Sequence, residues 1–487
     1  MSSVLKALDW GILFYFLAVN TFLLVLFGCA ALEMRGHLVR IREETRWRLL
    51  SSHVAPTVSM LVPACNEEAT IAESVRALLT VRYANLEVVV INDGSSDGTL
   101  DVLQREFELV PVLPIYRRRL EHREIRGLYR STVKTNLVVI DKENAGGKSD
   151  ALNAGLNVAT GELVCAMDAD TLIESEALLR MARPFIHGDD VVAAGGTVRV
   201  ANGSHVKGGR VQVPRAPRNA LAGIQALEYL RAFLFGRLGW NRLGGNLIIS
   251  GAFGLFRRET VIGAGGYLHG TVGEDMELVA RLRRQGIEQG TAHRVEFIPD
   301  PVAWTEAPQS LADLGRQRDR WQRGLADVLW RYRGVAFRPR YGTLGIVAFP
   351  YFLLVELLAP IVEALGLLGL AAGLALGAVD GTFALLFFLV AYGFGILLSL
   401  LTLVLDELSF RRYPQIRDGI LLVVWAVVES FGYRQLTTYW RLRGIAKFLR
   451  GRTEWGAMTR SGLATADEPP RGDPLSLAAT VDVCPNR

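Results

Sequence analysis

The chain has 487 residues, half of them hydrophobic, and its 54 lysines and arginines exceed its 49 aspartates and glutamates to give a formal net charge of +5. This length exceeds one ordinary domain and permits a large buried core. A mild basic excess without a basic block is not typical of nucleic-acid-binding proteins, so we expect no nucleic acid partner.

Two long apolar runs carry no charged residue. They cover residues 11–32 and 381–405. Each exceeds the roughly 20 residues that a helix needs to cross a bilayer. Two buried core helices are the alternative, which the absence of charge over such lengths disfavours.

Residues 1–34 are predicted to be a retained transmembrane anchor. The apolar run is too long for a signal peptide, and no small-residue cleavage site follows it. The next segment, RGHLVRIREETRWR, is rich in arginine. The positive-inside rule therefore places residues from 35 onward in the cytoplasm and the N-terminus outside.

Residues 52–335 alternate strand-like and helix-like segments. Apolar strands are predicted in TVSMLVPACNEE, LEVVVINDGSSDGT, LVVIDKENAGGK and ELVCAMDADT, with helical segments between them. Strands that are apolar on both faces and alternate with helices predict an α/β, Rossmann-like fold with a mostly parallel sheet.

Polar residues follow the end of each predicted strand. In such sheets, ligands bind beyond the carboxyl ends of the strands. We therefore expect these residues to converge on one crevice. They are Asn66 and Glu67, Asp93, Lys148, and Asp168 with Asp170.

The sequence MDADT is a candidate metal site. Asp168 and Asp170 alternate along an extended strand end, so both carboxylates can point toward one cation. A hard divalent ion with water and phosphate oxygens suits such ligands. Alone, the pattern is more typical of a solvated loop. Its place after an apolar strand, beside other polar strand ends, favours the metal site.

Two further loops have a functional and a structural interpretation. NAGGKSDALNAG places two glycines and Lys148 ahead of a helix, which suits a phosphate but also an ordinary glycine-rich helix start. Asp93 in NDGSSDGT can cap the next helix or contact a base or ribose. The residues alone leave both alternatives open.

The segment GEDMELVARLRRQG, residues 273–286, predicts an amphipathic helix. Glu274 and Asp275 lie at the positive end of its dipole. They either cap the helix or supply a carboxylate base that deprotonates a hydroxyl. Residues 244–259, a glycine-rich apolar stretch upstream, are expected to line a pocket floor.

Seven motifs occur in the order PACNEE, VVVINDGSSDGT, NAGGKSDALNAG, MDADT, ISGAFGLFRRE, GEDMELV and QRDRW. With them the sequence resembles the membrane-embedded, processive glycosyltransferases of family 2, over about residues 55–325. These include cellulose, hyaluronan and chitin synthases and the bacterial poly-N-acetylglucosamine synthases, which it resembles most. Asn92 stands where this family often has the first of two acids.

The resemblance implies a GT-A fold and an inverting transfer from a nucleotide-diphosphate sugar, usually UDP-linked. It implies that Asp93 contacts the nucleoside, Lys148 the diphosphate and Asp168 the nucleotide. Asp170 would ligate Mg²⁺ or Mn²⁺. Asp275 would be the general base.

QRDRW matches the QxxRW signature of this family through Gln317, Arg320 and Trp321. At i, i+3 and i+4 they share one helical face. Arg320 can neutralise the departing diphosphate, and Trp321 can stack on the acceptor sugar. The other predicted substrate contacts are Asn66, Glu67 and Glu274. Snorkelling at a membrane surface is the alternative for Arg316, Arg318 and Arg323.

Residues 341–440 are predicted to form transmembrane or interfacial helices. Within 341–380, prolines and acids predict either an interfacial helix followed by a crossing, or two crossings. Glu356 and Glu363 lie on one helical face and should contact protein, water or glycan, or form a structural polar pair.

The side of the C-terminus depends on the more polar segment 419–440. The cations after Arg434 favour a cytoplasmic C-terminus. Either 341–380 then crosses twice, or 419–440 does not cross.

Residues 464–487 are expected to be a disordered tail. The cysteines lack metal-site spacing and are expected to be free thiols; they are Cys29, Cys65, Cys165 and Cys484.

The sequence therefore predicts a multi-pass protein of the inner or plasma membrane with a cytoplasmic catalytic domain. The expected reaction extends a polysaccharide from UDP-GlcNAc or UDP-glucose with export, and the expected partners are the donor, the polysaccharide acceptor, the lipid bilayer and an accessory export subunit. The alternatives are transfer of one sugar to a lipid carrier, and a catalytically silent membrane receptor or scaffold.

Overall fold

The computed structural model describes residues 2–43, 55–291, 293–377 and 381–452. It divides into two compact units. The sheet unit consists, among these residues, of Val39–Pro217 and Asn246–Pro308. The helical unit consists of Met1–Leu38, Arg218–Gly245 and Gln309–Arg452. The predicted tail, 464–487, lies outside the described residues.

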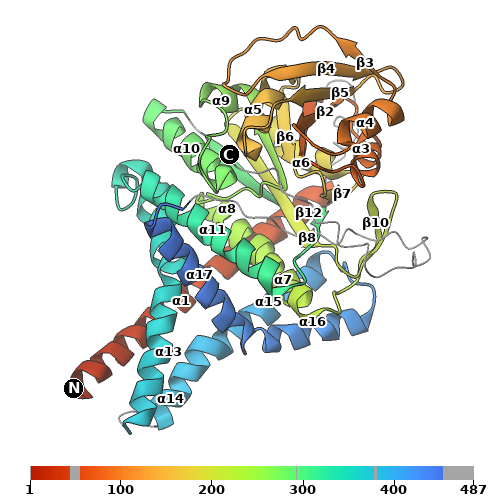
Figure 1. Ribbon diagram of the computed structural model, residues 1–487. Helices are drawn as coiled ribbons and strands as arrows, with labels where there is room; N and C mark the ends of the chain where they lie inside the picture. Colours follow the sequence, from red (N-terminus) through yellow and green to blue (C-terminus); the bar gives the residue numbers. More distant parts are fainter. Residues whose placement is uncertain (1, 44–54, 292, 378–380, 453–487) are drawn as a thin grey trace. The chain divides into compact units, whose positions relative to one another are not determined.

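Four neighbouring parallel strands form the part of the sheet that the sequence predicts (Figure 1). They are β1 (Val58–Ala64), β2 (Leu86–Asp93), β5 (Leu137–Lys142) and β6 (Leu163–Met167), in the order β5-β2-β1-β6. Their side chains are almost entirely buried. These parallel, buried strands confirm the predicted α/β fold. The prediction was possible because strands that are apolar on both faces need cover on both sides.

The complete sheet is mixed and runs β3-β4-β5-β2-β1-β6-β11-β8-β12-β7. The added strands are β3 (Leu109–Val112), β4 (Ile125–Ser131), β7 (Leu172–Ile173), β8 (Val191–Val200), β11 (Phe253–Arg257) and β12 (Arg294–Thr305). β11 is antiparallel to β6 and β8, whereas β8 and β12 are parallel. A separate hairpin pairs β9 (His205–Lys207) with β10 (Arg210–Val213).

The helices of the sheet unit are α3 (Ile71–Leu79), α4 (Thr99–Glu106), α5 (Lys148–Val158), α6 (Ala177–His187), α9 (Arg258–Gly263) and α10 (Glu274–Gln289). Helix α5 approaches β1 and β2 closely. A Cβ on Gly155 would lie 3.1 Å from a side-chain carbon of Ile91 and 3.2 Å from one of Leu61. This close packing places the start of α5 at the edge where the strands end.

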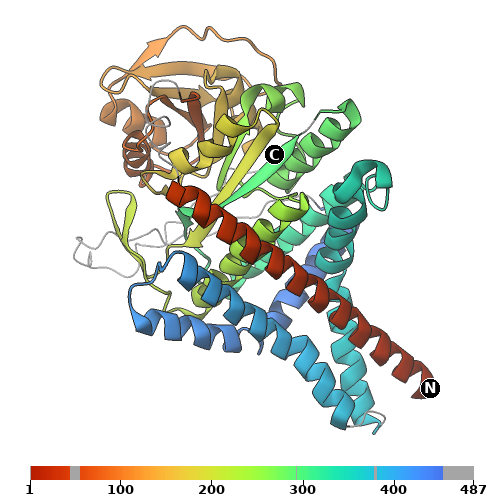
Figure 2. The same ribbon diagram turned by 180° about the vertical axis from the view of Figure 1, so that it is seen from behind.

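The helical unit begins with α1 (Ser2–Glu43), which Figure 2 shows along its whole length. Phe16 of α1 packs edge-on against Phe387, with ring centroids 6.0 Å apart. The remaining helices are α7 (Ala220–Leu230), η1 (Arg231–Arg237), α8 (Leu238–Leu243), α11 (Leu311–Arg331), η2 (Pro339–Tyr341), η3 (Leu344–Ala348), α12 (Phe349–Tyr351), η4 (Phe352–Leu357), α13 (Ala359–Ala375), α14 (Gly381–Phe388), η5 (Leu389–Gly393), α15 (Phe394–Ser409), α16 (Ile416–Val428) and α17 (Tyr433–Leu449).

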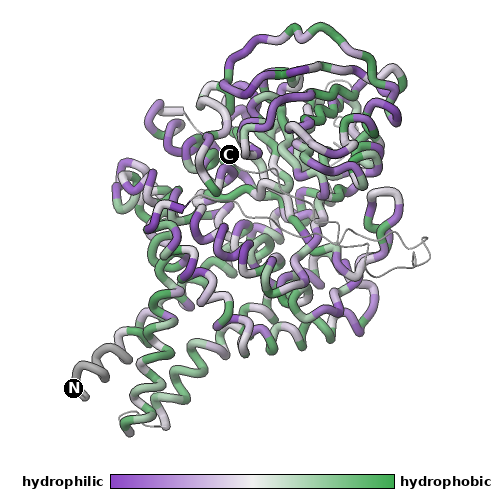
Figure 3. The backbone as a smooth tube through the Cα atoms, in the orientation of Figure 1, coloured by the Kyte–Doolittle hydropathy of each residue, from purple (hydrophilic) through white to green (hydrophobic). Residues whose placement is uncertain are grey.

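Two helices in the described residues are long and apolar enough to cross a membrane, Trp10–Ile41 and Gly381–Ser409. They contain the two uncharged runs that the sequence predicts. A third candidate is a bent pair, Leu344–Leu357 with Ala359–Ala375, whose axes differ by 41°. Figure 3 shows α13 and α14 as mainly hydrophobic. Segment 419–440 divides between the short helices α16 and α17, which favours the alternative in which it does not cross.

Two acids in the apolar segment pair with arginines of α17 and not with each other. Glu363 is 2.6 Å from Nε of Arg434, and Glu356 is 3.5 Å from Nη2 of Arg441. Acids in apolar segments need such partners. Glu356 and Glu363 therefore contact protein, as expected, and their arginine partners indicate a structural role.

The snorkelling alternative is wrong for Arg318 and Arg323, which are buried. Arg318 pairs with Glu228, and Nε of Arg323 lies 2.9 Å from Asp319. Arg316 has a half-exposed side chain and pairs with an acid of its own helix.

The cysteine prediction holds only in part. Cys29 and Cys165 are free, but Cys65 is disulfide-bonded, so the expectation of four free thiols is wrong. Cys484 lies outside the described residues.

Candidate active site

Lys148 connects two of the predicted motifs. It is the first residue of α5, and Asp168 directly follows β6. Nζ of Lys148 donates to Oδ1 of Asp168 at 2.5 Å and to the carbonyl oxygen of Gly251 at 2.8 Å. NAGGK and MDADT, which follow β5 and β6, thus meet at the same edge of the sheet, as the sequence predicts, although two strands lie between β5 and β6.

The peptide group of Gly251 extends this contact to a third motif. Its N–H donates to Oδ2 of Asp275 at 3.1 Å, while Oδ1 of Asp275 accepts the N–H of Met276 at 2.8 Å. Two backbone donors therefore fix the orientation of the Asp275 carboxylate. Lys148, Asp168, Gly251 and Asp275 form one hydrogen-bonded chain, which we call the site chain.

The charges around Lys148 favour its ammonium form. Burial would lower its pKa, but Asp168, Glu274 and Asp275 outweigh burial, so the pKa of Lys148 is raised. Glu274 is buried at the first position of α10. The site therefore keeps a partly buried cation among carboxylates, and a cation is what an anionic ligand such as a phosphate requires.

Asp168 and Asp170 fit a metal ion that also takes ligands from a substrate. Among the described residues, no three histidines, cysteines or acids group into a complete metal site. Two carboxylates suit Mg²⁺ or Mn²⁺ if phosphate and water oxygens supply the remaining ligands. The donor set is thus compatible with the predicted metal, and the role of Asp170 stays a prediction.

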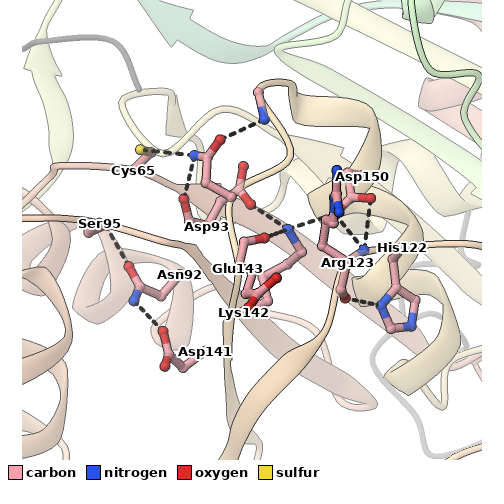
Figure 4. Close-up of polar contacts among 12 residues, drawn as sticks. Cys65, Asn92, Asp93, Ser95, His122, Arg123, Asp141, Lys142, Glu143 and Asp150 are labelled. Atoms are coloured by element: carbon pink, nitrogen blue, oxygen red, sulfur yellow. Dashed lines mark hydrogen bonds and ion pairs between the residues drawn. The ribbon is translucent and has the colours of Figure 1, made fainter. Parts of the chain in front are cut away.

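Another lysine, Lys142, is buried beside Asp93 (Figure 4). Nζ of Lys142 is 2.5 Å from Oδ1 of Asp93 and 2.6 Å from Oδ2 of Asp150, and the lysine side chain is fully buried. Asp150 also accepts the N–H of Arg123 at 3.0 Å. Burial raises the pKa of Asp93, although Lys142 opposes this. We call Asp93, Lys142 and Asp150 the buried triad.

Sequence reasoning missed Lys142 and Asp150. The available signal was a lysine at the end of a strand that is otherwise apolar on both faces, since such a charge needs a partner. Asp93 is thus neither a simple helix cap nor fully exposed to a ligand. Its predicted contact with the nucleoside stays a prediction.

The loop between β5 and α5 is held close to the end of β2. Nδ2 of Asn144 donates to the carbonyl of Asp93 at 2.7 Å, and its Oδ1 accepts the N–H of Gly146 at 2.6 Å. Gly94 has φ +64°, and a Cβ there would lie 2.8 Å from the backbone nitrogen of Asn144. The glycine of NDGS is therefore required by conformation and by close approach.

Asn66 and Glu67 join the loop after β1 to the residues after β2. Oδ1 of Asn66 accepts the N–H of Ser96 at 2.8 Å. The N–H of Glu67 donates to Oγ1 of Thr99 at 2.9 Å, and Oε2 of Glu67 accepts from Thr70 at 2.7 Å. These contacts are structural, and substrate binding by either residue stays a prediction.

Gln317, Arg320 and Trp321 lie on α11 in the helical unit. Gln317 is buried, whereas Trp321 is 44% exposed. The Trp321 ring stacks with Tyr229 at a centroid distance of 6.5 Å, and the guanidinium carbon of Arg318 lies 4.6 Å from its centroid. The exposed aromatic surface expected of Trp321 is present, supported by Tyr229, which sequence reasoning missed.

Comparison with known proteins adds family information. The family described as "Glycosyl transferase family 2" matches residues 59–261, and "Glycosyl transferase family group 2" matches residues 163–398. Among curated proteins, the poly-beta-1,6-N-acetyl-D-glucosamine synthase of Staphylococcus aureus (strain COL) is 25% identical over 297 residues, 61% of this chain and 60% of that protein. The alignment thus spans about 60% of that relative's length.

Two further similarities extend this comparison. The probable glycosyltransferase YdaM of Bacillus subtilis (strain 168) is 25% identical over 321 residues, 65% of this chain and 66% of that protein. The solved mannosyltransferase PcManGT of Pyrobaculum calidifontis, in complex with GDP-Man and Mn²⁺, has a TM-score of 0.50 and 20% identity. It covers 88% of this chain and 99% of that chain, and this similarity concerns the fold alone.

The buried triad generates a stability prediction. Replacing Lys142 by Met leaves the buried carboxylates of Asp93 and Asp150 without their cation, which should cost about 3–5 kcal/mol of unfolding free energy. The matched control is Arg126→Met, because Arg126 pairs with Asp141 at 2.8 Å with a half-exposed side chain. Loss of that pair should cost about 1 kcal/mol or less. Denaturant unfolding of the purified protein measures both, and equal effects would contradict the prediction.

Proposed function

Since the chain is a family 2 glycosyltransferase, we propose that it transfers a sugar from UDP-GlcNAc or UDP-glucose onto a growing polysaccharide at the membrane, with export. The observation that carries this proposal is the site chain, in which Lys148, Asp168 and Asp275 are linked through Gly251. The names of the staphylococcal relatives favour GlcNAc. An accessory export subunit is the further partner we propose.

The proposed reaction is a single inverting displacement. The acceptor hydroxyl attacks the anomeric carbon from the face opposite the diphosphate, the new glycosidic bond forms, and the bond to the diphosphate breaks. Asp275 takes the hydroxyl proton. Lys148 binds the departing diphosphate. A retaining double displacement would need a second carboxylate close to the anomeric carbon, where none is proposed.

Asp168 and Asp170 would hold Mg²⁺ or Mn²⁺. When bound, the ion would act as a Lewis acid that neutralises charge on the diphosphate. Asp168 is already within reach of Lys148, so the same carboxylate can orient the lysine and face the nucleotide. Asp93 would contact the nucleoside.

Trp321 would bind the acceptor sugar by stacking, and Arg320 would neutralise the leaving group. Gln317 shares their helix. Aromatic faces suit the apolar faces of sugar rings, and the ring of Trp321 is partly exposed. We also propose that Asn66, Glu67 and Glu274 contact substrate; this rests on the family resemblance.

We propose that the sheet unit is cytoplasmic. If the bent pair counts as one span, the chain crosses three times, from an outside N-terminus to a cytoplasmic C-terminus. That side agrees with the cations after Arg434.

A panel of radiolabelled UDP-sugars, supplied to membranes with Mg²⁺ or Mn²⁺, tests the function. We expect one donor, UDP-GlcNAc or UDP-glucose, to yield a high-molecular-weight product and free UDP. A label found only in a solvent-extractable lipid would instead support transfer of one sugar to a lipid carrier. Absence of any turnover with every donor would favour the silent scaffold.

The Asp275→Asn variant tests the base. The amide keeps the size of the side chain but cannot accept the proton, so kcat should fall by about 10²–10⁴-fold. UDP binding, measured by calorimetry, should change little. The control is Glu288→Gln on the same helix, where Glu288 pairs with Arg284. Full activity of Asp275→Asn would show that the base assignment is wrong.

Metal dependence is the next prediction. Chelation by EDTA should abolish transfer, because without the metal the charge on the departing diphosphate is not neutralised. Added Mg²⁺ or Mn²⁺ should restore transfer. Asp170→Asn should raise the Mn²⁺ concentration for half-maximal activity by about ten-fold or more. A neutral amide oxygen is a weaker ligand than a carboxylate, and a ten-fold weaker affinity corresponds to about 1.4 kcal/mol of binding free energy. Asp190→Asn, at the surface pair with Arg294, is the control. Full activity in EDTA would contradict the prediction.

A further inference from the structure

The bent pair in the helical unit breaks at Leu358, between η4 and α13. Pro360 has no N–H to donate to the carbonyl of Glu356. The N–H of Ile361 donates to Leu358 at 3.0 Å instead of to Leu357. The carbonyls of Glu356 and Leu357 therefore receive no donor from the normal helical pattern, and in an apolar segment they require one from elsewhere.

Two side chains from other helices supply these donors. Nε2 of Gln322 on α11 donates to the carbonyl of Leu357 at 3.2 Å and to that of Glu356 at 3.5 Å. Nη2 of Arg441 on α17 donates to the carbonyl of Glu356. Nε of Arg441 donates to Oε1 of Gln322 at 2.8 Å. Gln322 and Arg441 thus bond to each other and to the break; we call this set the latch.

The latch is buried and adjoins the acceptor motif. Gln322 is 3% exposed and directly follows Trp321. A buried amide with both ends bonded fixes its helix in register and rotation, because a shift would leave polar groups unsatisfied. The latch therefore sets the position of Trp321 relative to the broken span.

Helix α11 has a second attachment that does not involve the break. Oδ2 of Asp319 lies 2.5 Å from Nζ of Lys447 and 3.0 Å from Nε of Arg443, both on α17. Removing Lys447 weakens the attachment between α11 and α17 but leaves the latch unchanged. This provides a matched control.

We propose that Gln322 and Arg441 are positioning residues that fix the position of Trp321 relative to the broken span, and that the latch determines how long the acceptor stays bound between additions and hence the length of the polysaccharide. This inference rests on the proposed function. None of the latch residues belongs to the site chain, which lies in the sheet unit. Loosening the latch should therefore raise the rate of product release by a larger factor than it lowers the rate of sugar transfer, to which Arg320 of the same helix is proposed to contribute.

Product length separates these two rates, because mean length is the ratio of extension to release. In Gln322→Met, which preserves volume but removes both polar ends, mean length should fall by about ten-fold, which corresponds to about 1.4 kcal/mol. The initial rate of UDP release should fall by a smaller factor than the mean length, and KM for the donor should stay near wild type. Lys447→Met should retain the wild-type length. Lengths are measured by gel electrophoresis of labelled product from the full-length protein.

Arg441→Lys is the second variant and decides the matter if Gln322→Met does not fold. Lysine keeps the charge opposite Glu356 but lacks the planar set of donors that serves Gln322 and the carbonyl together. It should shorten the product as well. Wild-type length in both folded variants, or equal shortening by Lys447→Met, would overturn the latch. If the wild type itself transfers only one sugar, the proposed polymerisation fails first, and the latch proposal fails with it.

Discussion

The site depends on one partly buried cation, Lys148, placed among carboxylates from two other segments, the residues after β6 and the start of α10. Asp168 accepts directly from it, and Glu274 and Asp275 raise its pKa from the start of α10. Removing a charge from water without a partner would destabilise the fold, and in this structure Asp168 is the partner that accepts from Lys148. Because acids outnumber the cation, a diphosphate alone would meet repulsion. A bound divalent ion would relieve this repulsion, so the proposed metal and the proposed phosphate contact of Lys148 depend on each other.

Both ends of the loop between β5 and α5 are anchored by lysines, of which Lys142 is fully buried and Lys148 partly buried. Lys142 ends β5 and pairs with Asp93 and Asp150, while Lys148 begins α5 and pairs with Asp168. The glycines between them are therefore held at both flanks and retain backbone N–H groups at a helix start. Such a loop can meet a phosphate without a large ordering cost.

The strand ends were predictable because apolar runs and helix periodicity are local properties of the sequence. That Lys148 and Asp168 lie at the same edge of the sheet follows from them, since the strands of a parallel sheet all end at one edge; their direct contact across two intervening strands does not. The buried triad was not predictable, because Asp93, Lys142 and Asp150 are distant partners and no pattern records a pairing. The antiparallel insertion of β11 was missed for a similar reason, as its residues do not specify strand direction. The platform under Trp321 came from Tyr229, on a helix with no motif.

The cations of α17 have two functions that sequence reasoning does not separate. As charges after the last apolar segment they indicate a cytoplasmic side, yet Arg434 and Arg441 pair with Glu363 and Glu356. Paired charges add little net charge to a membrane surface, so they contribute less to orientation than a count implies. Their second function is to neutralise Glu356 and Glu363, which lie in an apolar segment and need arginine partners to be stable there. The broken span can therefore reach its final structure only together with α17, and α11, which Gln322 joins to both, is fixed by the same assembly step.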